Sequence, residues 1–313
     1  MTEGAVQSRG MGRDTAARAL FLVAVMLAGP RCGTRSAAID EEATGARIRV
    51  VASIAPLADL ARRVGGDRVV VSTLVPPGAS EHTWEPAPRD VARLRDVRLF
   101  VTVGVGFEPW AGRLVDASSQ TVTIVDASQG VDLIAESDDD APAHANPHYW
   151  LDPISARACV PRLADALSAL DPEGREGYQR RAEDLRAQLD GLDREIRART
   201  SRFTSRGLVT FHAAWDYFAR RYGLTVVASI EAFPGREPGP RRVVEIVGLV
   251  RRDKVRAVFA EPQSSAKAAE AIAGECGVPV RVLDPLGGDG VPGRGDYFSL
   301  MRYNVAVLEE ALR

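Results

Sequence analysis

The strongest constraint on the fold is a regular alternation of apolar strand patterns with amphipathic helix patterns. Residues 47–56 form a strongly apolar run that is typical of a buried strand, and residues 56–66 follow with helical spacing and end at Gly65-Gly66. Strands separated by helices of about 10–15 residues predict βαβ units and mostly parallel sheets. We expect further strands at residues 67–78, 98–106, 120–128, 206–212, 224–233, 254–262 and 278–288, and further helices at 88–95, 108–117, 213–223, 241–253, 264–277 and 297–312.

The helices between the two alternating regions have a different character. Residues 154–170 predict one helix, and residues from about 173 to 202 predict a second helix of roughly 30 residues that would span about 45 Å. The second helix is highly charged and has a narrow apolar stripe, formed by Tyr178, Leu185, Leu189, Leu192 and Ile196. We therefore expect an α/β fold in which two mostly parallel-sheet lobes are joined by one long rigid connector helix.

The chain of 313 residues is long enough for two domains of ordinary size. We expect a leader in residues 1–38, an N-terminal lobe in 39–170, the connector helix in 171–203 and a C-terminal lobe in 204–313. No internal repeat with a period of 20–50 residues is evident in the sequence.

The amino end has the pattern of a signal peptide. Arg13 and Arg18 precede an apolar run at residues 19–29, which has the length of a signal-peptide core and is too short to span a bilayer. Met1 and Met11 are alternative start sites. The pattern predicts an exported, periplasmic protein.

Two ways of processing this leader remain open. Residues 36–38 (Ser-Ala-Ala) offer the small residues that an ordinary signal peptidase needs. Lipid attachment at Cys32 is the alternative, although Gly29-Pro30-Arg31 is a poor lipid-attachment sequence. We favour the soluble form. Cys159 and Cys276 lie on predicted helices in different halves, and we expect two small buried thiols rather than a disulfide.

Charge and motif content exclude several function classes. The net charge is −2, and without residues 1–38, which hold five Arg and two acidic residues, 35 basic residues face 40 acidic ones, or −5. Nucleic-acid binding needs clustered positive charge, so we expect no nucleic-acid partner. The sequence has no G-x-x-x-x-G-K-[ST] motif, so we expect no nucleotide either. It also lacks the H-E-x-x-H motif of metalloproteases and the G-x-S-x-G motif of α/β-hydrolases.

Four residues at predicted strand ends form the candidate metal site. His82, His148, His212 and Asp284 are separated by 66, 64 and 72 residues. Open α/β sheets bind ligands at the carboxyl ends of their strands. Three imidazoles and a carboxylate are a suitable donor set for Zn²⁺ in four-coordinate geometry. We therefore predict a metal site between the two lobes, although each residue taken alone has an ordinary structural role open to it.

Other polar residues next to these motifs have open roles. Glu81 is an alternative fourth ligand in place of Asp284. Asp152 either orients the His148 ring or caps the helix that begins near residue 154. For Glu261 we expect packing or pairing near the cleft, because buried carboxylates need partners. The fourth histidine, His144, lies in a short acidic loop, where we expect it to be exposed.

Several segments resemble the metal-binding solute receptors of bacterial ABC importers, the ZnuA/TroA-like cluster A-I family. The resemblance extends from about residue 48 to residue 312. Its segments, in chain order, are GASEHTWEPAPRD, GVGFEPW, NPHYWLDP, FHAAWDYFARRYGL, FAEPQ, LDPLGG and YFSLMRYN. The resemblance implies two α/β lobes linked by one rigid helix, with the metal held between the lobes by His82, His148, His212 and Asp284.

The same resemblance indicates the cargo. A histidine at position 212 is typical of the zinc branch, since manganese-type members commonly have Glu there, and the Glu81-His82 pair is also similar to zinc-specific members. Many zinc receptors have a long His- and Asp-rich loop before the second ligand. The corresponding loop in this chain, residues 135–147, is short and has one His, so it departs from that pattern and does not predict an auxiliary role in metal loading.

The leading hypothesis is a monomeric, non-enzymatic receptor that captures Zn²⁺ as cargo and delivers it to an ABC importer permease. One alternative keeps the receptor role but changes the cargo to Mn²⁺ or Fe²⁺, which ligand type disfavours for manganese. The other is an exported zinc hydrolase with three His ligands and an open water position. Only Glu81 and Glu261 lie near a His motif where such an enzyme would need a general base.

Overall fold

The first sheet is built from four parallel strands in the order β2-β1-β3-β4. The computed structural model describes residues 47–118, 121–136, 144–231 and 235–313. The strands are β1 (Ile48–Ala52), β2 (Val69–Thr73), β3 (Val97–Thr102) and β4 (Thr123–Asp126). Their apolar residues make β1 and β3 almost fully buried, as expected for central strands of a parallel sheet.

The second sheet repeats this topology. Its strands are β7 (Gly207–Thr210), β8 (Thr225–Ser229), β9 (Val258–Ala260) and β10 (Val280–Val282), in the parallel order β10-β9-β7-β8. Counted within its own half, each sheet has its first strand between the second and the third, and its fourth strand beyond the third. The predicted α/β fold with two parallel-sheet lobes is confirmed, and both lobes belong to one compact unit, Thr44–Arg313.

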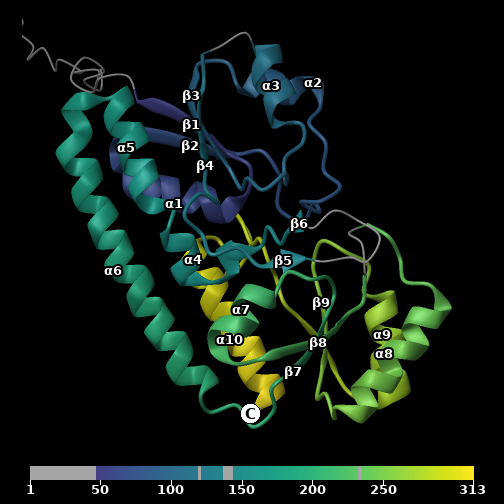
Figure 1. Cartoon of the computed structure of the whole chain (residues 1–313). Helices are drawn as coiled ribbons and strands as arrows, with labels where there is room; N and C mark the ends of the chain where they lie inside the picture. Colours follow the sequence, from purple (N-terminus) through teal and green to yellow (C-terminus); the bar gives the residue numbers. More distant parts are fainter. Residues whose placement is uncertain (1–46, 119–120, 137–143, 232–234) are drawn as a thin grey trace, which may run out of the picture. The chain divides into compact units, whose positions relative to one another are not determined.

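Helices cover the sheets and connect the lobes (Figure 1). In the first half they are α1 (Ala55–Gly65), α2 (Pro88–Arg93), α3 (Ala111–Ser118), α4 (Pro153–Arg157) and α5 (Val160–Leu170). The others are α6 (Arg175–Thr200), α7 (Asp216–Tyr222), α8 (Pro240–Arg252), α9 (Lys267–Cys276) and α10 (Tyr297–Leu312). In the described part of the chain, none of these helices has the length and hydropathy needed to cross a membrane.

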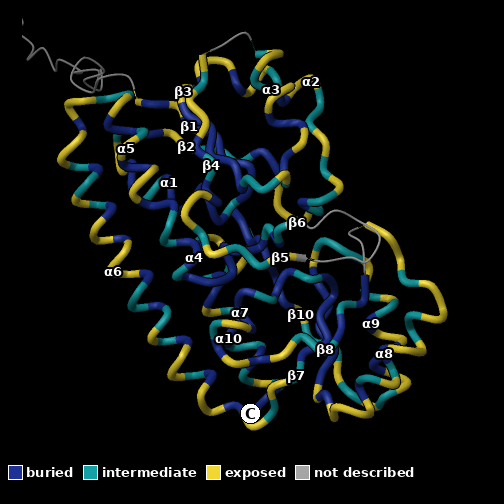
Figure 2. Tube along the Cα trace, in the orientation of Figure 1, coloured by how far each residue is buried: buried dark blue, intermediate teal, exposed yellow. Residues whose placement is uncertain are grey.

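The connector helix α6 has 26 residues and is therefore about 39 Å long. It is shorter than predicted because Pro172–Gly174 forms a separate 3₁₀ turn before it. The predicted apolar stripe is its buried face, and the other faces are exposed (Figure 2). The helix packs against α1, α4 and α5 of the first lobe and against α7 and α10 of the second. The long connecting helix is thus confirmed.

Several predicted elements differ from the structure. The helix predicted at 154–170 is divided into α4 and α5, because Pro161 lacks an N–H and its ring would clash with a preceding carbonyl in a continuous helix. The helix predicted at 213–223 begins only at Asp216, after a turn, and ends at Gly223 in the left-handed conformation (φ 68°). The leader, residues 1–38, lies outside the described residues.

A short antiparallel pair, β5 (Ala135–Glu136) with β6 (His144–Ala145), was not predicted. It brackets the acidic loop, of which residues 137–143 lie outside the described part. Cys159 and Cys276 are free thiols, as expected, but only Cys159 is buried, and Cys276 is partly exposed.

The main hydrophobic core continues through both lobes. It includes Leu57 from α1, Leu189 from α6, Tyr217 from α7 and Met301 from α10, together with Trp150, and all five are fully buried. Side chains from α1 in the first half and α10 in the second therefore pack in one core. Such packing limits how far the lobes can separate without exposing apolar surface.

Candidate metal centre

Four side chains from three distant segments converge at the carboxyl edges of the two sheets. Glu81, His82, His148 and His212 each offer one ligand atom, and these atoms all lie within 4.8 Å of one another. Glu81 and His82 lie on the loop after β2, and His212 follows β7 by two residues. His148 comes directly before a 3₁₀ turn at Tyr149–Leu151. The structure therefore brings together the three predicted histidines and the alternative ligand Glu81.

The three imidazoles have the spacing of ligands around one small cation. His148 Nε2 lies 2.9 Å from His82 Nε2 and 3.1 Å from His212 Nε2. The three ring centroids are 4.8 to 5.1 Å apart. Zinc–nitrogen bonds of about 2.0–2.1 Å in a tetrahedron place neighbouring ligand nitrogens about 3.3 Å apart. A shift of a few tenths of an ångström would therefore fit Zn²⁺ between the rings.

Asn146 determines how His148 presents its nitrogens. The Asn146 amide nitrogen donates to the Ala213 carbonyl at 2.7 Å and to Asp216 at 3.1 Å, which leaves Oδ1 as an acceptor. His148 Nδ1 lies 2.9 Å from that oxygen and must therefore carry the hydrogen. Burial, followed by the charges of the other two histidines, holds the pKa of His148 well below its usual value. The neutral ring thus presents the Nε2 lone pair to the cluster.

Glu261 plays the same part for His212. Their Nδ1 and Oε2 atoms lie 2.6 Å apart, so the ring donates to the carboxylate. Burial by itself lowers the pKa of His212, but the charge of Glu261 and its hydrogen bond outweigh burial and raise the pKa to about 9. Hydrogen bonds of this kind orient metal-binding histidines and increase their basicity. His212 is therefore a strongly basic candidate ligand, and a metal ion has to compete with a proton for its Nε2 atom.

Glu81 is a buried carboxylate with one oxygen that accepts no hydrogen bond from the described residues. It is 5% exposed, and its Oε1 has no hydrogen-bond partner among the described residues. The nearest basic atom to Oε1 is His212 Nε2, at 3.8 Å. Burial, opposed in part by the charge of His212, raises the pKa of Glu81 to about 7. A cation among the histidines would satisfy this oxygen, because buried charges need a counter-charge or a metal.

His82, the third histidine of the cluster, lies against aromatic side chains. Its ring lies edge-on to Phe107, with the centroids 5.3 Å apart, and Phe107 in turn contacts Trp150 at 5.8 Å. Burial, assisted by the charge of His212, lowers the pKa of His82 to about 3. The ring is therefore neutral at physiological pH and has a lone pair available for a metal.

Asp284 lies outside the group of four. Its Oδ1 accepts hydrogen bonds from Gln263 and from the backbone N–H groups of Leu286 and Gly287. Its Oδ2 accepts from Arg294 Nη1 at 2.8 Å. The carboxylate is 2% exposed, and each of its oxygens has at least one partner. Both oxygens of Asp284 therefore have hydrogen-bond donors and do not require a metal ion to balance their burial.

A family model described as "Zinc-uptake complex component A periplasmic" matches residues 50–311 of the chain. The chain belongs to the ZnuA family. The high-affinity zinc uptake system protein ZnuA of Bacillus subtilis (strain 168) is 28% identical over 309 residues, which cover 94% of this chain and 97% of the relative. The manganese ABC transporter substrate-binding lipoprotein PsaA of Streptococcus mitis is 26% identical, and the match covers 94% and 96% of the two chains. A crystal structure of ZnuA has a TM-score of 0.77 at 32% identity and matches 85% of this chain and 99% of that chain.

The ZnuA-family site also answers the questions that the sequence left open about neighbouring residues. Asp152 caps α4 by accepting from Ile154 N and is paired with Arg221, so it does not orient His148. Glu261 pairs near the cleft, as expected, and its partner is His212. The side chain of His144 lies outside the described residues.

Asn146 was missed by the sequence analysis. Its signal is present in the motif N-P-H, which places an amide two residues before the candidate ligand His148. The motif was used only for its histidine and its aspartate. An amide that close to a predicted ligand could have been considered for orienting the ring.

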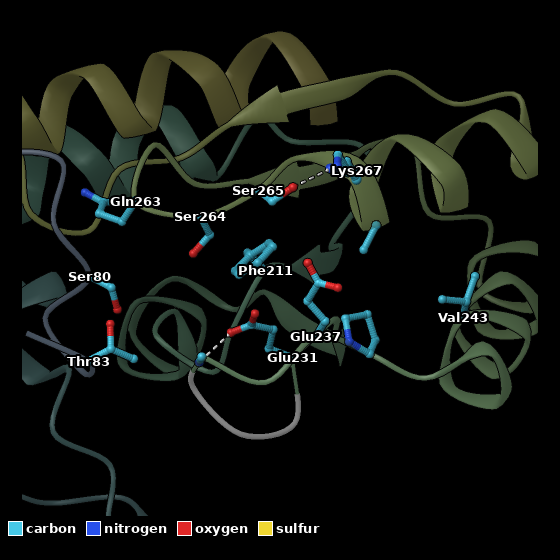
Figure 3. Close-up of a pocket in the computed structure, with 13 residues that line it drawn as sticks. Ser80, Thr83, Phe211, Glu231, Glu237, Val243, Gln263, Ser264, Ser265 and Lys267 are labelled. Carbon is cyan, nitrogen blue, oxygen red and sulfur yellow. Dashed lines mark hydrogen bonds between the residues drawn. The ribbon is translucent and has the colours of Figure 1, made fainter.

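A cavity of about 430 Å³ adjoins the candidate metal centre of this ZnuA-family chain (Figure 3). Ser80 and Thr83, which flank Glu81 and His82, lie along one side of it, and Phe211, which precedes His212, lies within its lining. Glu231 also lines the cavity and accepts a hydrogen bond from Gly235 N at 3.0 Å. The centre is therefore bordered by solvent-accessible space with a carboxylate in its wall.

Proposed function

We propose that the chain is an extracytoplasmic receptor that captures Zn²⁺ as cargo between its lobes and delivers it to the membrane permease of an ABC importer. The ligands in this proposal are His82, His148, His212 and Glu81. The observation that supports it most directly is the convergence of three Nε2 atoms, 2.9 and 3.1 Å apart, beside an unpartnered carboxylate oxygen. Asp284 is not a ligand in this proposal, because its oxygens accept from other donors.

The donor set favours zinc over manganese. Three neutral imidazoles and one carboxylate suit tetrahedral Zn²⁺, whereas Mn²⁺ prefers sites rich in oxygen ligands. The family contains relatives named for each metal, since the Bacillus subtilis relative is a zinc uptake protein and the Streptococcus mitis relative a manganese transporter lipoprotein. Family membership therefore does not distinguish the two metals, and the proposal of zinc for this chain rests on its ligand types.

The proposal gives the chain no catalytic role. A zinc hydrolase needs an open coordination position for water, and Glu81 fills the fourth position here. The comparisons give the hydrolase alternative no support, because the relatives are transport receptors. The proposed partner is a membrane permease rather than a nucleotide or a nucleic acid, and we propose that the receptor acts as a monomer.

The location and the domain division belong to the same proposal. We take residues 1–38 as a signal peptide and leader, the mature protein as periplasmic, and lipid attachment at Cys32 as the alternative. The lobes are residues 39–170 and 204–313, with residues 171–203 between them. The leader pattern in the sequence supports export.

Metal titration tests the proposal. The purified chain from residue 39 onward is titrated with Zn²⁺ and with Mn²⁺, beside His212→Ala, and the same samples are assayed for hydrolysis of ester and peptide substrates. We expect one tightly bound Zn²⁺ per chain, weaker Mn²⁺ binding, large loss of zinc affinity in His212→Ala and no turnover. Absence of tight zinc binding would overturn the ligand assignment, and zinc-dependent turnover would restore the hydrolase alternative.

A further inference from the structure

Two buried carboxylates near the metal centre differ in how their charges are balanced. Glu81 and Asp284 are 5% and 2% exposed, and the charge of Asp284 is among those that raise the pKa of Glu81. Asp284 has a permanent cation, Arg294, at 2.8 Å. The only basic atom paired with Glu81 is His212 Nε2 at 3.8 Å, among the described residues, and it is charged only when protonated.

Arg294 is held beside Asp284 by the loop that joins β10 to α10. The Arg294 carbonyl accepts from Gly288 N at 3.0 Å, and its own N–H donates to Val291 at 3.1 Å. Gly287 has a φ of 58°, and a Cβ there would lie 2.4 Å from the Arg294 carbonyl oxygen, so the loop needs glycine to close. The loop therefore returns the arginine to the aspartate ten residues before it.

The guanidinium group of Arg294 is held beside Asp284 by a second contact. It lies over the ring of Tyr303, 4.6 Å from the centroid, and its side chain is 18% exposed. Its Nε is buried and has no hydrogen-bond partner among the described residues. If Asp284 left to bind a metal, Arg294 would remain largely buried without its carboxylate, which is strongly unfavourable. The pair thus opposes any movement of Asp284 toward the cluster.

We propose that Arg294 determines which carboxylate binds the metal: it retains Asp284 outside the coordination sphere, so the cargo binds three imidazoles and Glu81. This inference rests on the proposed receptor function and deepens it. With Asp284 withheld, the site has one oxygen donor and four ligands, which suits Zn²⁺. With Asp284 released, a second carboxylate would give a site of higher coordination number that is more favourable to Mn²⁺.

The test compares Arg294→Gln with Arg294→Lys, Asp284→Asn and the double variant Arg294→Gln/Asp284→Asn. Zn²⁺ and Mn²⁺ affinities are measured by competition titration, and the coordination number is read from X-ray absorption of the zinc form and the visible spectrum of the Co²⁺ form. Arg302→Gln is the matched control, because Arg302 is an exposed arginine on α10 that pairs with Glu195.

We expect Arg294→Gln to increase Mn²⁺ affinity relative to Zn²⁺ by roughly tenfold or more, and to add an oxygen ligand to the bound metal. Arg294→Lys, which keeps the charge, should resemble the wild type, as should the Arg302 control. Asp284→Asn in the wild-type background should leave the metal ligands unchanged, and in the Arg294→Gln background it should abolish the gain.

Three outcomes would overturn the inference. The first is a folded Arg294→Gln protein with an unchanged zinc-to-manganese ratio and coordination number. The second is an effect of Arg294→Gln that persists in the double variant. The third, which needs only the wild type and Asp284→Asn, is loss of an oxygen ligand from zinc in Asp284→Asn. Failure of the wild type to bind zinc would instead overturn the proposed function itself, so the two failures are distinguishable.

Discussion

His148 and His212 place their Nε2 atoms 3.1 Å apart, although 64 residues separate them in the chain. Each ring uses its Nδ1 hydrogen on an oxygen acceptor, Asn146 for His148 and Glu261 for His212. The facing Nε2 atoms would therefore be two lone pairs in contact unless a proton or a metal ion lay between them. Because the pKa of His212 is raised to about 9, its Nε2 carries such a proton at neutral pH, and a bound metal ion would replace that proton.

Zinc affinity should fall as the pH falls, in two stages. The pKa of His212 is raised to about 9 and that of Glu81 to about 7, so each group must lose a proton to bind metal at a pH below its own pKa. Between pH 9 and pH 7 the affinity should fall about tenfold per pH unit, and below pH 7 about a hundredfold per unit. Competition titrations across this range, with calorimetry in buffers of different ionisation enthalpy to count protons, measure both stages. A flat profile from pH 9 to pH 7 would contradict the role given to His212.

Glu261→Gln should reduce the proton release that accompanies zinc binding. Without the carboxylate, burial is no longer outweighed and the pKa of His212 falls. At pH 8 the number of protons displaced should therefore decrease from about one toward zero. The matched control is Glu270→Gln, an exposed glutamate on α9, which should leave proton release unchanged. Equal proton release in both variants would show that Glu261 does not control His212.

Asn146→Ala should weaken zinc binding by about 10- to 100-fold, the usual cost of losing a group that orients a metal ligand. Asn146 is fully buried and holds His148 Nδ1 at 2.9 Å, so its removal frees the ring to rotate and to change tautomer. Gln179→Ala removes an exposed amide that contacts Asp165 and should have no effect. Affinities are compared by chelator competition, and circular dichroism checks that each variant is folded. Unchanged affinity in folded Asn146→Ala would exclude an orienting role.

Glu81→Gln should decrease zinc affinity at least tenfold, because the site loses a carboxylate that would bind the metal directly rather than a group that only orients a ligand. Glu85→Gln, four residues away on the same loop and exposed, is the control and should retain wild-type affinity. X-ray absorption of the zinc form should show one fewer oxygen ligand in Glu81→Gln alone. If Asp284→Asn rather than Glu81→Gln removes that oxygen, the fourth ligand is Asp284.

Much of the fold could be predicted because its signals are local. The alternation of strand and helix patterns predicted both parallel sheets, and the apolar stripe of Tyr178 and Leu185 predicted the buried face of α6. Pro161 also indicated a break between α4 and α5, but the sequence prediction treated residues 154–170 as one helix. The common strand order of the two sheets was not predicted, because strand order depends on contacts between segments far apart in the chain.

The candidate site was predictable to the extent that residue types indicate chemistry. Three histidines at strand ends indicated a metal, since a parallel sheet brings the ends of its strands to one edge. The hydrogen-bond partners of the ligands were harder to predict. Asn146 belongs to a motif that was examined only for its histidine and aspartate, and Arg294 is one of 40 basic residues in the sequence, without a motif that distinguishes it.

Local patterns in the sequence were enough to predict the fold class, the family resemblance and the three histidines as candidate ligands. Folding distinguishes the two candidate carboxylates, because it brings Glu81 to the histidines and gives Asp284 other partners. Glu81 and Asp284 are both acidic residues beside recognisable motifs, and nothing local separates them. The difference arises because a loop closed by Gly287 brings Arg294 to Asp284, while burial leaves Glu81 Oε1 without a hydrogen-bond partner among the described residues. The balance of buried charge depends on residues brought together by folding, and these are not neighbours in the sequence.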